Sequence, residues 1–531
     1  MFPLTVDHLL WRMSNVHPQS EVVSIAEETG CTVTTRWAFP DVASRVRKLA
    51  SGIHSSMGVA RGDVVAILAF NTLEHFEALL AVPLLGAAVN SLNARLSPEV
   101  LVDQALSPRP DAVLVDAEML DHPVLGDSAR TVLGALRDAR VPLIVVGDQD
   151  WSGLAHAFVR YEDLVDLGAT TAAPAPVDDE NTTAYLFHTS GTTGRPKSYQ
   201  VSHRAVVLHT LSQATTEASG LTRTDRVLPL APFFHVNGWG LPLTCALTGA
   251  SLLLCGGDLA ADRVGKIIHD EAVTAAAAVP TIWHDVCRAV ATGRAPRPSA
   301  LREVFSGGSA VPHSVVRSVE DVLGARVGTA WGMTETMACS TYERTDPTTS
   351  AGVPIPLVEM RLDHDGFDHE GSGPAMGKLQ VRGPFVVGVQ DGSTTWFDTG
   401  DIASLDARGR LTLHDREKDL IKSGGEWIAT AELEQYLCTH PAVIAAAVVP
   451  IAHPRWIERP LAYIVTLDDE VHPDIETMLR TFVGDRFPRW WIPDHIVVLD
   501  SLPRTAVGKV DKVRLRSQSS TDIQIQSEAL A

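Results

Sequence analysis

One short stretch of the chain, TSGTTGRPKS at residues 189–198, combines residue types that bind phosphate. Two glycines, Gly191 and Gly194, lie among small hydroxyl side chains, and Lys197 follows them. A glycine loop lets several backbone N–H groups face one anion, and hydroxyls and a lysine add further donors. The preceding apolar segment, 183–188, predicts a strand, so the loop begins where a strand ends. The stretch therefore predicts an anion-binding loop, with an ordinary surface turn as the alternative.

The spacing of this loop differs from that of a Walker A motif, GxxxxGK[ST]. Gly191, Gly194 and Lys197 succeed one another at intervals of three, and Pro196 precedes the lysine. A proline there would fit poorly in the helix turn that follows a Walker glycine. The sequence thus predicts a phosphate loop of another kind.

Short apolar runs separated by helical patterns are the elements that must position this loop. The runs at 64–70, 112–116, 143–147 and 251–255 predict buried strands. Ser97, which stands before a proline, predicts a helix start that its side chain caps. Such alternation is typical of layered α/β domains with largely parallel sheets.

The sequence pattern changes at about residue 353. Short alternating runs among glycines and aspartates predict β-hairpins across 353–414, and 415–427 is dense in charge and glycine. Strand and helix patterns of their own follow. We therefore divide the chain into a large N-terminal domain, 1–417, and a small C-terminal domain, 418–531, with the boundary at Lys418.

Composition limits the classes of partner. The 531 residues are 45% hydrophobic and 20% charged, which is ordinary for a globular protein, and the formal net charge is −20. That charge argues against nucleic acid or an anionic membrane as a partner, because its field repels polyanions. A small anion in a locally basic cleft stays compatible with it.

The remaining composition points to the cytoplasm. The six cysteines include no CxxC pair and predict reduced, buried thiols. The N-terminus has no basic segment before an apolar core, so no signal peptide is expected. The most apolar stretch, 239–255, is interrupted by Pro242 and Gly249, so no membrane span is expected either.

Seven motifs occur in a fixed order along the chain. They are YLFHTSGTTGRPKS (185–198), PFFHVNGWG (232–240), FSGGSA (305–310), AWGMTET (330–336), WFDTGD (396–401), DREKDLIKSGGEWI (415–428) and LPRTAVGKVDK (502–512). Together they resemble the AMP-forming adenylating enzymes, which include acyl-CoA synthetases, luciferases and peptide-synthetase adenylation domains. HVNGWG, KSGGEWI and WWIPD are most similar to the medium-chain fatty acyl-CoA synthetase branch.

The resemblance implies a fold and a reaction. The fold is a large N-terminal domain of layered α/β subdomains plus a β-rich subdomain, and a small mobile α+β C-terminal domain. In the reaction, a carboxylate attacks the α-phosphorus of ATP to give an acyl-adenylate and pyrophosphate, and the acyl group then passes to CoA. ATP, Mg²⁺ and CoA are the implied cofactors. Such chemistry depends on positioning and on cations more than on covalent groups.

The resemblance also assigns a nucleotide site to the motifs. The implied ATP/AMP-binding residues are Thr189, Ser190, Gly191, Thr192, Thr193, Gly194, Lys197, Gly307, Gly308, Ser309, Trp331, Gly332, Asp401 and Arg416.

Individual roles follow from that assignment. Glu335 is the magnesium position and Thr334 lies near the phosphates, both as catalytic residues. Asp401 accepts both ribose hydroxyls, which a two-oxygen acceptor can do in parallel. Arg416 is the cation near ribose and phosphate, and Trp331 stacks on adenine. Each role has a structural alternative. Glu335 could be a solvated glutamate and Asp401 a β-turn aspartate. Arg416 could form a surface ion pair, and Trp331 could be a core aromatic residue.

The C-terminal motifs imply a domain rotation between the two half-reactions. Lys509 is the catalytic lysine that reaches carboxylate and α-phosphate oxygens during adenylation, and Lys418 is the hinge. After rotation a CoA channel would be lined by Lys422, Ser423, Gly424, Gly425, Glu426 and Trp427. The implied acyl pocket contains His235, which is also a catalytic candidate, together with Trp239 and Gly240.

Two residues depart from the motif of the family. Ser198 stands where a glycine usually follows the loop lysine, and His188 replaces an aromatic or apolar residue before the loop. These departures leave a second hypothesis open, in which another acceptor or oxyanion is used: a carrier protein, an amine, or nitrite activated for diazotisation. A third hypothesis is a catalytically silent nucleotide-binding relative. It is opposed by the intact catalytic set, which consists of Lys509, Glu335, Asp401 and Arg416. The expected partners are a small carboxylate, ATP and CoA, and the sequence leaves a homodimer open.

Overall fold

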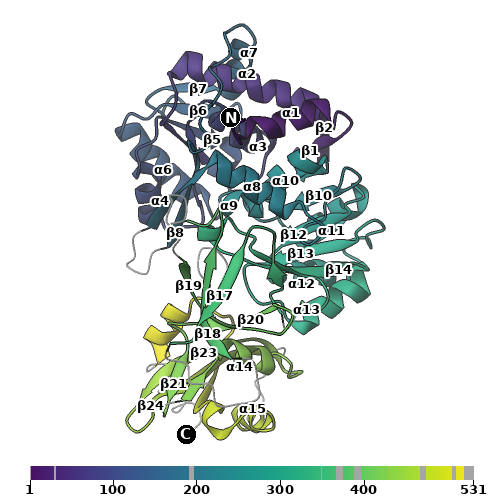
Figure 1. The fold of residues 1–531 in the computed structure, drawn as a ribbon, viewed down its shortest axis with the longest axis vertical. Coiled ribbons are helices and arrows are strands. Elements are labelled where there is room, and N and C mark those ends of the chain that lie inside the picture. The colour runs from purple at the N-terminus through teal and green to yellow at the C-terminus, as the bar shows by residue number, and fades with distance from the viewer. Residues whose placement is uncertain are drawn as a thin grey trace.

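The computed structural model describes residues 2–28, 31–190, 196–347, 350–365, 375–387, 396–424, 426–466, 474–504 and 510–519. In this part of the chain two layered α/β sheets form the upper body of the molecule, and two smaller sheets form its lower end (Figure 1).

The first α/β sheet has the strand order β7-β6-β5-β3-β4-β8-β9, and each pair is parallel except β8 with β9. β5 is buried at every position, as expected for a parallel strand covered on both faces. Its strands are β3 (Val64–Leu68), β4 (Ala88–Ser91), β5 (Ala112–Asp116), β6 (Leu143–Val146), β7 (Phe158–Arg160), β8 (Thr183–Ser190) and β9 (Pro196–Ser202). The accompanying helices are α2 (Phe39–Met57), α3 (Leu73–Leu84), α4 (Pro98–Leu106), α5 (Ala117–Asp121), α6 (Gly126–Asp138) and α7 (Tyr161–Gly168).

The second α/β sheet has the order β16-β15-β14-β13-β12-β10-β11-β1-β2 and is parallel from β14 to β1. Its strands are β1 (Glu21–Glu28), β2 (Cys31–Ala38), β10 (Arg226–Pro229), β11 (Ser251–Leu254), β12 (Ala275–Ala278), β13 (Glu303–Gly307), β14 (Arg326–Trp331), β15 (Thr341–Glu343) and β16 (Val353–Pro354). The helices around it are α1 (Asp7–Asn15), α8 (His203–Gln213), α9 (Val236–Trp239), α10 (Leu241–Thr248), α11 (Ala261–Asp270), α12 (Pro280–Ala291), α13 (His313–Ser318), the π-helix η1 (Val319–Leu323) and the 3₁₀ turn η2 (Thr334–Thr336).

The lower end contains the hairpin region and the C-terminal part. An antiparallel sheet is formed by β17 (Glu359–Asp363), β18 (Met376–Arg382), β19 (Phe397–Leu405) and β20 (Leu411–Arg416). The last sheet contains β21 (Ile421–Ser423), β22 (Glu426–Ile428), β23 (Val443–His453), β24 (Ile457–Thr466) and β25 (His495–Val498), accompanied by α14 (Thr430–Leu437), α15 (Ile475–Gly484) and the 3₁₀ turn η3 (Arg489–Trp491).

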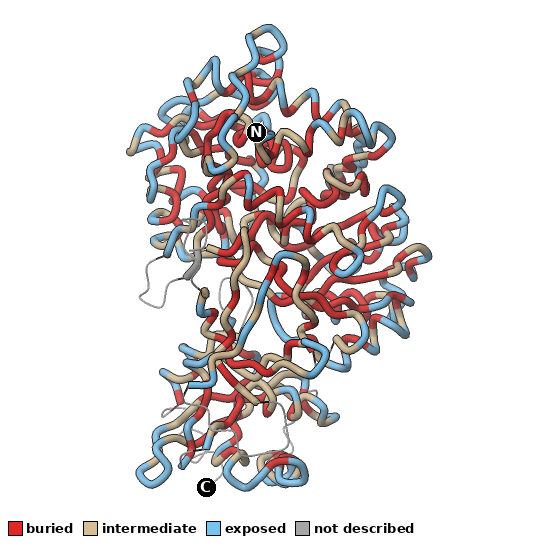
Figure 2. The backbone as a smooth tube through the Cα atoms, in the orientation of Figure 1, coloured by how far each residue is buried: buried red, intermediate tan, exposed pale blue. Residues whose placement is uncertain are grey.

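One apolar cluster joins the two α/β sheets. It contains Ile67 of β3, Phe76 of α3, Val206 of α8, Leu243 of α10 and Leu252 of β11, all with at most 2% of their surface exposed. Buried residues therefore fill the upper body, while exposed residues follow its outer helices and loops (Figure 2). This core makes the edge of the sheets a rigid support for loops.

Most sequence expectations about elements are confirmed. The predicted strands correspond to β3, β5, β6 and β11, and the hairpin region is an antiparallel sheet. Ser97 is the N-cap residue of α4 as predicted, but its side chain forms no capping hydrogen bond, so that detail is wrong. Of the six cysteines, Cys245, Cys255, Cys287 and Cys339 are free and buried as predicted. Cys438 is free but only half-buried, so its predicted burial is wrong, and the side chain of Cys31 lies outside the described residues. No helix among the described residues combines the length and apolar character that crossing a membrane requires.

Candidate functional site

Two of the predicted motifs, FSGGSA and AWGMTET, lie at one edge of the second α/β sheet. β13 and β14 are parallel neighbours, and Gly307 lies opposite Ala330 in their register. The segments that follow them, 307–309 and 331–335, therefore leave the sheet from the same edge. Ligands of parallel α/β sheets bind at this carboxyl edge. The η2 turn that contains Glu335 also contacts β8, the strand that leads into the predicted phosphate loop.

The phosphate loop connects two strands of a hairpin. β8 and β9 pair up to Ser190 opposite Pro196, with Thr189 opposite Lys197. α8 begins only after β9, at His203. A strand, and not a helix, thus follows the loop, which accounts for its departure from Walker A spacing. Lys197 is exposed.

Several predicted loop residues cannot be placed. Gly191, Thr192, Thr193 and Gly194 lie outside the described residues, as do the side chains of Thr189 and Ser190. Their phosphate contacts stay predictions.

Asp401 is a buried carboxylate that two donors fix in place. It lies on β19 with 5% of its surface exposed, and it is paired across the ladder with Arg416 on β20. The Arg416 Nε atom lies 2.8 Å from Oδ1, and the Trp331 indole N–H donates to Oδ2 at 3.0 Å. A second Arg416 nitrogen donates to the carbonyl of Thr399 at 3.0 Å. A carboxylate has two acceptor oxygens, so a residue of this type can serve two ribose hydroxyls in parallel.

Trp331 links the α/β sheet to the hairpin sheet. Its ring belongs to an apolar cluster with Leu379, Val381, Ala403 and Leu411, and only 8% of the residue is exposed. These contacts fit the core-aromatic alternative, in which the indole positions Asp401. Its stacking on adenine stays a prediction.

Glu335 is a buried carboxylate in the segment that follows Trp331. It is 7% exposed in the η2 turn, next to the half-buried Thr334. The turn requires a glycine before it, because a Cβ atom at Gly332 would lie 1.6 Å from the Ala338 carbonyl oxygen. The described residues contain no cluster of three potential metal-ligating side chains. A single carboxylate still fits Mg²⁺, which commonly keeps waters and binds substrate phosphates with only one or two protein carboxylates.

The predicted acyl-pocket segment has an unusual backbone. Val236, Asn237, Gly238, Trp239 and Gly240 have φ values of 34°, 45°, 62°, 59° and 73°, which makes five consecutive left-handed residues. A left-handed conformation costs a non-glycine residue on the order of 1–2 kcal/mol, so the surrounding structure must stabilise this turn.

The turn brings Trp239 of the predicted acyl pocket close to Gly307 and Gly308 of the predicted nucleotide site. A Cβ atom at Gly307 would lie 3.7 Å from the Trp239 ring, and one at Gly308 would lie 3.8 Å from it. Trp239 is half-buried, and its indole lies beside the two glycines, of which Gly307 is buried. His235 is also half-buried and lies edge-on to Phe234, with ring centroids 4.9 Å apart. Gly308 and Ser309 are exposed at the sheet edge.

His188 and Ser198 face each other across the hairpin register. The Nε2 atom of His188 is buried without a hydrogen-bond partner in the described part of the chain. Burial lowers the pKa of His188 to about 4, so the imidazole is neutral at neutral pH. This departure from the family pattern therefore adds no charge beside the phosphate loop.

The predicted CoA channel forms the β21–β22 hairpin. The Lys422 ammonium lies 5.0 Å from the centroid of the Trp427 ring. The hydroxyl of buried Ser423 accepts from Arg459 at 3.2 Å. Gly424 has φ 62°, and a Cβ atom there would lie 2.8 Å from the Trp456 ring, so both the backbone conformation and the neighbouring ring favour glycine here.

The rest of the channel prediction is only partly described. Glu426 is exposed, Trp427 packs against the cluster of Ile402 and Leu420, and Gly425 lies outside the described residues. Lys509 also lies outside them, so neither the channel nor the catalytic lysine is tested by the geometry.

A polar network that sequence reasoning missed crosses the predicted hinge. Lys418 is exposed in the turn between β20 and β21. Before it, Asp415 Oδ2 accepts the backbone N–H and the hydroxyl of Thr430 at 2.6 and 2.5 Å. Lys512 donates to the Thr430 hydroxyl at 2.6 Å and lies 2.7 Å from Glu434. The only available signal was a second lysine in the motif LPRTAVGKVDK. The hinge role of Lys418 stays a prediction.

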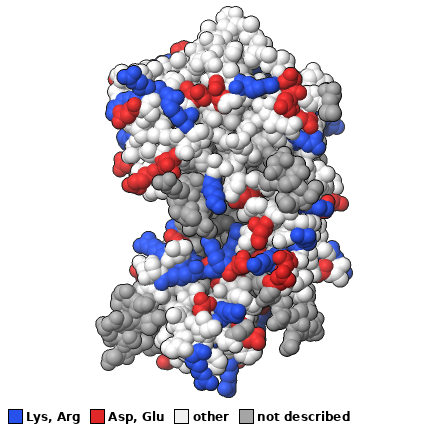
Figure 3. All heavy atoms as spheres, turned by 60° about the vertical axis from the view of Figure 1, so that its left-hand side comes forward, with Lys and Arg blue, Asp and Glu red and all other residues white. Residues whose placement is uncertain are grey.

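Positive side chains gather locally despite the net charge of −20. Figure 3 shows a band of Lys and Arg side chains across the middle of one face, with Asp and Glu side chains beside it at one end. Such a band attracts anionic ligands over short distances.

Comparisons with known proteins agree with the motifs. The family described as AMP-binding enzyme matches residues 11–389, and the AMP-binding enzyme C-terminal domain matches residues 432–509. A medium-chain-fatty-acid–CoA ligase of Ectopseudomonas oleovorans is 35% identical, with 97% of this chain and 96% of the relative covered. A 3-methylmercaptopropionyl-CoA ligase of Ruegeria lacuscaerulensis is 34% identical, with 97% of each chain covered.

Solved structures give the same fold. An o-succinylbenzoate CoA synthetase from Bacillus subtilis, in complex with its acyl-adenylate intermediate, is 25% identical and has a TM-score of 0.73; the match covers 96% of this chain and 97% of that one. An anthranilate CoA ligase in complex with anthranoyl-AMP has a TM-score of 0.83 at 23% identity and covers 98% of each chain.

Proposed function

The chain belongs to the AMP-binding enzyme family, and we propose on that basis that it is an ATP-dependent, AMP-forming ligase that joins a medium-chain or aryl carboxylate to CoA. The observation that carries the proposal is the meeting of Asp401, Trp331 and Arg416 at the edge where 307–309 and Glu335 also lie. Asp401 would accept the ribose hydroxyls, and the glycine segment would allow the purine to approach the backbone.

The first half-reaction makes a mixed anhydride. A carboxylate oxygen of the acid bonds to the α-phosphorus of ATP as the bond to the β-phosphate breaks, and pyrophosphate leaves. Negative charge grows on the leaving group, so cations of the chain, Lys197 and Lys509, would stabilise the transition state. Glu335 would hold Mg²⁺, which when bound neutralises phosphate charge.

The second half-reaction transfers the acyl group. The sulfur of CoA bonds to the carbonyl carbon, the bond to the adenylate oxygen breaks, and AMP leaves with that oxygen. The chain would change posture around Lys418 so that the β21–β22 hairpin replaces Lys509 at the site. The division into 1–417 and 418–531 is part of this proposal.

The acyl chemistry is proposed from relatives and from the site. The relatives include a medium-chain fatty-acid CoA ligase, and Trp239 offers an aromatic surface beside Gly307 and Gly308. His235, which precedes the left-handed turn, would belong to the same pocket. The proposed location is the cytoplasm, where ATP and CoA are supplied. A homodimer is the oligomeric state to test, by light scattering of the purified protein.

A panel of acids tests the proposal. Purified enzyme receives ATP, Mg²⁺ and single C6–C12 or aryl acids, with and without CoA, and AMP release is measured. We expect CoA to accelerate AMP release many-fold with at least one acid. AMP release that is indifferent to CoA but stimulated by an amine, a carrier protein or nitrite would reject CoA as the acceptor and leave the adenylating half standing.

A further inference from the structure

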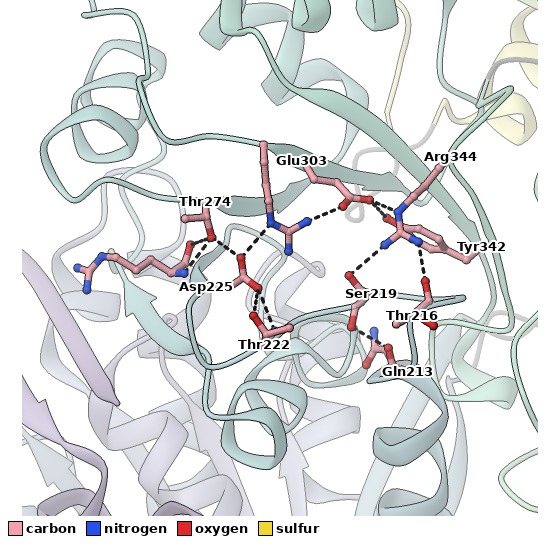
Figure 4. Close-up of polar contacts among 11 residues, drawn as sticks. Gln213, Thr216, Ser219, Thr222, Asp225, Thr274, Glu303, Tyr342 and Arg344 are labelled. Atoms are coloured by element: carbon pink, nitrogen blue, oxygen red, sulfur yellow. Dashed lines mark hydrogen bonds and ion pairs between the residues drawn. The ribbon is translucent and has the colours of Figure 1, made fainter. Parts of the chain in front are cut away.

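A network of buried polar side chains lies beside the left-handed turn and continues to the start of β13 (Figure 4). Gln213, the last residue of α8, is 4% exposed. Its Nε2 atom donates to the carbonyl oxygen of Trp239 at 2.8 Å, and its Oε1 atom accepts from the Thr244 hydroxyl at 2.9 Å. One amide group thus fixes the end of the turn and the helix that follows it.

Gln213 is itself held from the opposite side. Its backbone carbonyl accepts from the backbone N–H of Ser219 at 3.0 Å and from the Ser219 hydroxyl at 2.7 Å. Arg344 donates to the Ser219 carbonyl at 3.0 Å and to the carboxylate of fully buried Glu303 at 2.6 Å. Glu303 begins β13, and Gly307 ends it. The network therefore joins the strand of the glycine segment to the turn.

Close packing prevents the turn from moving toward its neighbours. A Cβ atom at Gly240 would lie 2.7 Å from Oε1 of Gln213 and 3.2 Å from the His209 ring. A Cβ atom at Gly238 would lie 2.8 Å from the Phe233 ring. Real Cβ atoms do not approach within 3.0 Å, so these surroundings favour glycine at 238 and 240, the residue that also adopts a left-handed backbone at little cost.

We propose that Gln213 is a positioning residue for the acyl site. It holds the Trp239 carbonyl, and it thereby fixes the Trp239 indole above Gly307 and Gly308. The inference rests on the proposed ligase function and deepens it by naming a determinant of which carboxylates fit. Without the Gln213 donor, the strained turn relaxes, the indole leaves the glycines, and longer or bulkier acids gain room.

The test compares selectivity and not activity alone. Gln213→Met keeps the length of the side chain but removes both hydrogen bonds, and Gln213→Glu removes the donor only. Thr210→Val is the matched control on the same helix, because the buried Thr210 hydroxyl bonds only within α8, to the Val206 carbonyl at 2.7 Å. The measurement is kcat/KM for C6, C8, C12 and aryl acids at saturating ATP and CoA.

Both Gln213 variants should shift the C12 to C6 ratio of kcat/KM by about tenfold toward the longer acid, with the KM for ATP changed less than threefold. The control should keep the ratio within about twofold. In a Trp239→Ala background the Gln213 substitutions should add no further shift, because the effect passes through that indole.

A uniform loss across all acids, with the ratio unchanged, would overturn the inference and leave Gln213 with a folding role only. A full shift that persists in the Trp239→Ala background would also overturn it. A wild-type enzyme that turns over none of the acids would instead reject the proposed function, so the two failures are distinguishable.

Discussion

Asp401→Asn perturbs the nucleotide site at the group whose geometry is best defined. The substitution keeps the volume of the side chain but removes its charge and places an NH₂ group among donors. One carboxylate oxygen faces the Arg416 Nε atom at 2.8 Å, and the other faces the Trp331 Nε1 atom at 3.0 Å. Either orientation of the asparagine therefore sets a donor against a donor.

The expected loss follows from the hydrogen bonds involved. Hydrogen bonds to charged groups contribute about 1.5–3 kcal/mol each, and two proposed ribose bonds lose their charged acceptor. Arg416 and Trp331 remain in the site and can still interact with the nucleotide, so the two losses should not add in full. We therefore expect a loss of about 3 kcal/mol, or about 100-fold in kcat/KM for ATP.

The assay is acid-dependent ATP–pyrophosphate exchange at varied ATP, with thermal unfolding measured in parallel. Glu359→Gln is the control, because Glu359 forms an exposed ion pair with Arg382 on the same sheet and such pairs contribute little. A variant at position 401 that melts normally and keeps kcat/KM for ATP within threefold of wild type would refute the assignment of Asp401.

Four further predictions concern other parts of the chain. Lys509→Ala should lower adenylation by orders of magnitude while thioester formation from supplied acyl-adenylate survives, and equal loss of both half-reactions would contradict its role. Lys418→Pro should leave adenylation and stop thioester formation, because proline fixes φ at the proposed hinge; unchanged turnover would place the hinge elsewhere. Ser198→Gly should change the KM for ATP and kcat less than about threefold, and a larger drop would give the serine a specific role. Burial, followed by the nearby Glu118, raises the pKa of Asp116 from 3.8 to about 7. The contribution of Asp116 to stability is therefore fully present below about pH 4 and is lost as the pH rises through 7. Asp116→Asn should reduce the fall in the free energy of unfolding between pH 4 and 8 by up to about 4 kcal/mol, and a pH profile equal to that of the wild type would contradict the raised pKa.

The sequence predicted the layered architecture because its signals are local. Apolar runs of strand length, such as 112–116 and 251–255, are buried in the parallel sheets at almost the predicted residues. The hairpin region was predicted equally well, since alternation and turn residues specify antiparallel pairs within a few residues. Capping by Ser97 failed because a cap bond depends on local geometry that the residue type does not fix.

The site required contacts between distant residues that no local pattern contains. The bond from Trp331 to Asp401 spans 70 positions, and only the assembled sheets bring the two together. No local pattern predicted the left-handed turn, because Val236 and Trp239 adopt a conformation that their residue types disfavour and that the distant Gln213 stabilises by its bond to Trp239. The order of the motifs predicted the roles of residues such as Asp401, whereas only the folded chain shows which residues bond to them.

The central claim is that the reaction passes through an acyl-adenylate, and the fate of one carboxylate oxygen atom tests it most directly. Carboxylate labelled with ¹⁸O is incubated with the enzyme, ATP, Mg²⁺ and CoA, and the AMP and thioester are analysed by mass spectrometry. Attack of the carboxylate on the α-phosphorus, followed by cleavage at the acyl carbon, predicts AMP that carries one ¹⁸O atom. Unlabelled AMP formed together with thioester, or ADP in place of AMP, would contradict the acyl-adenylate route.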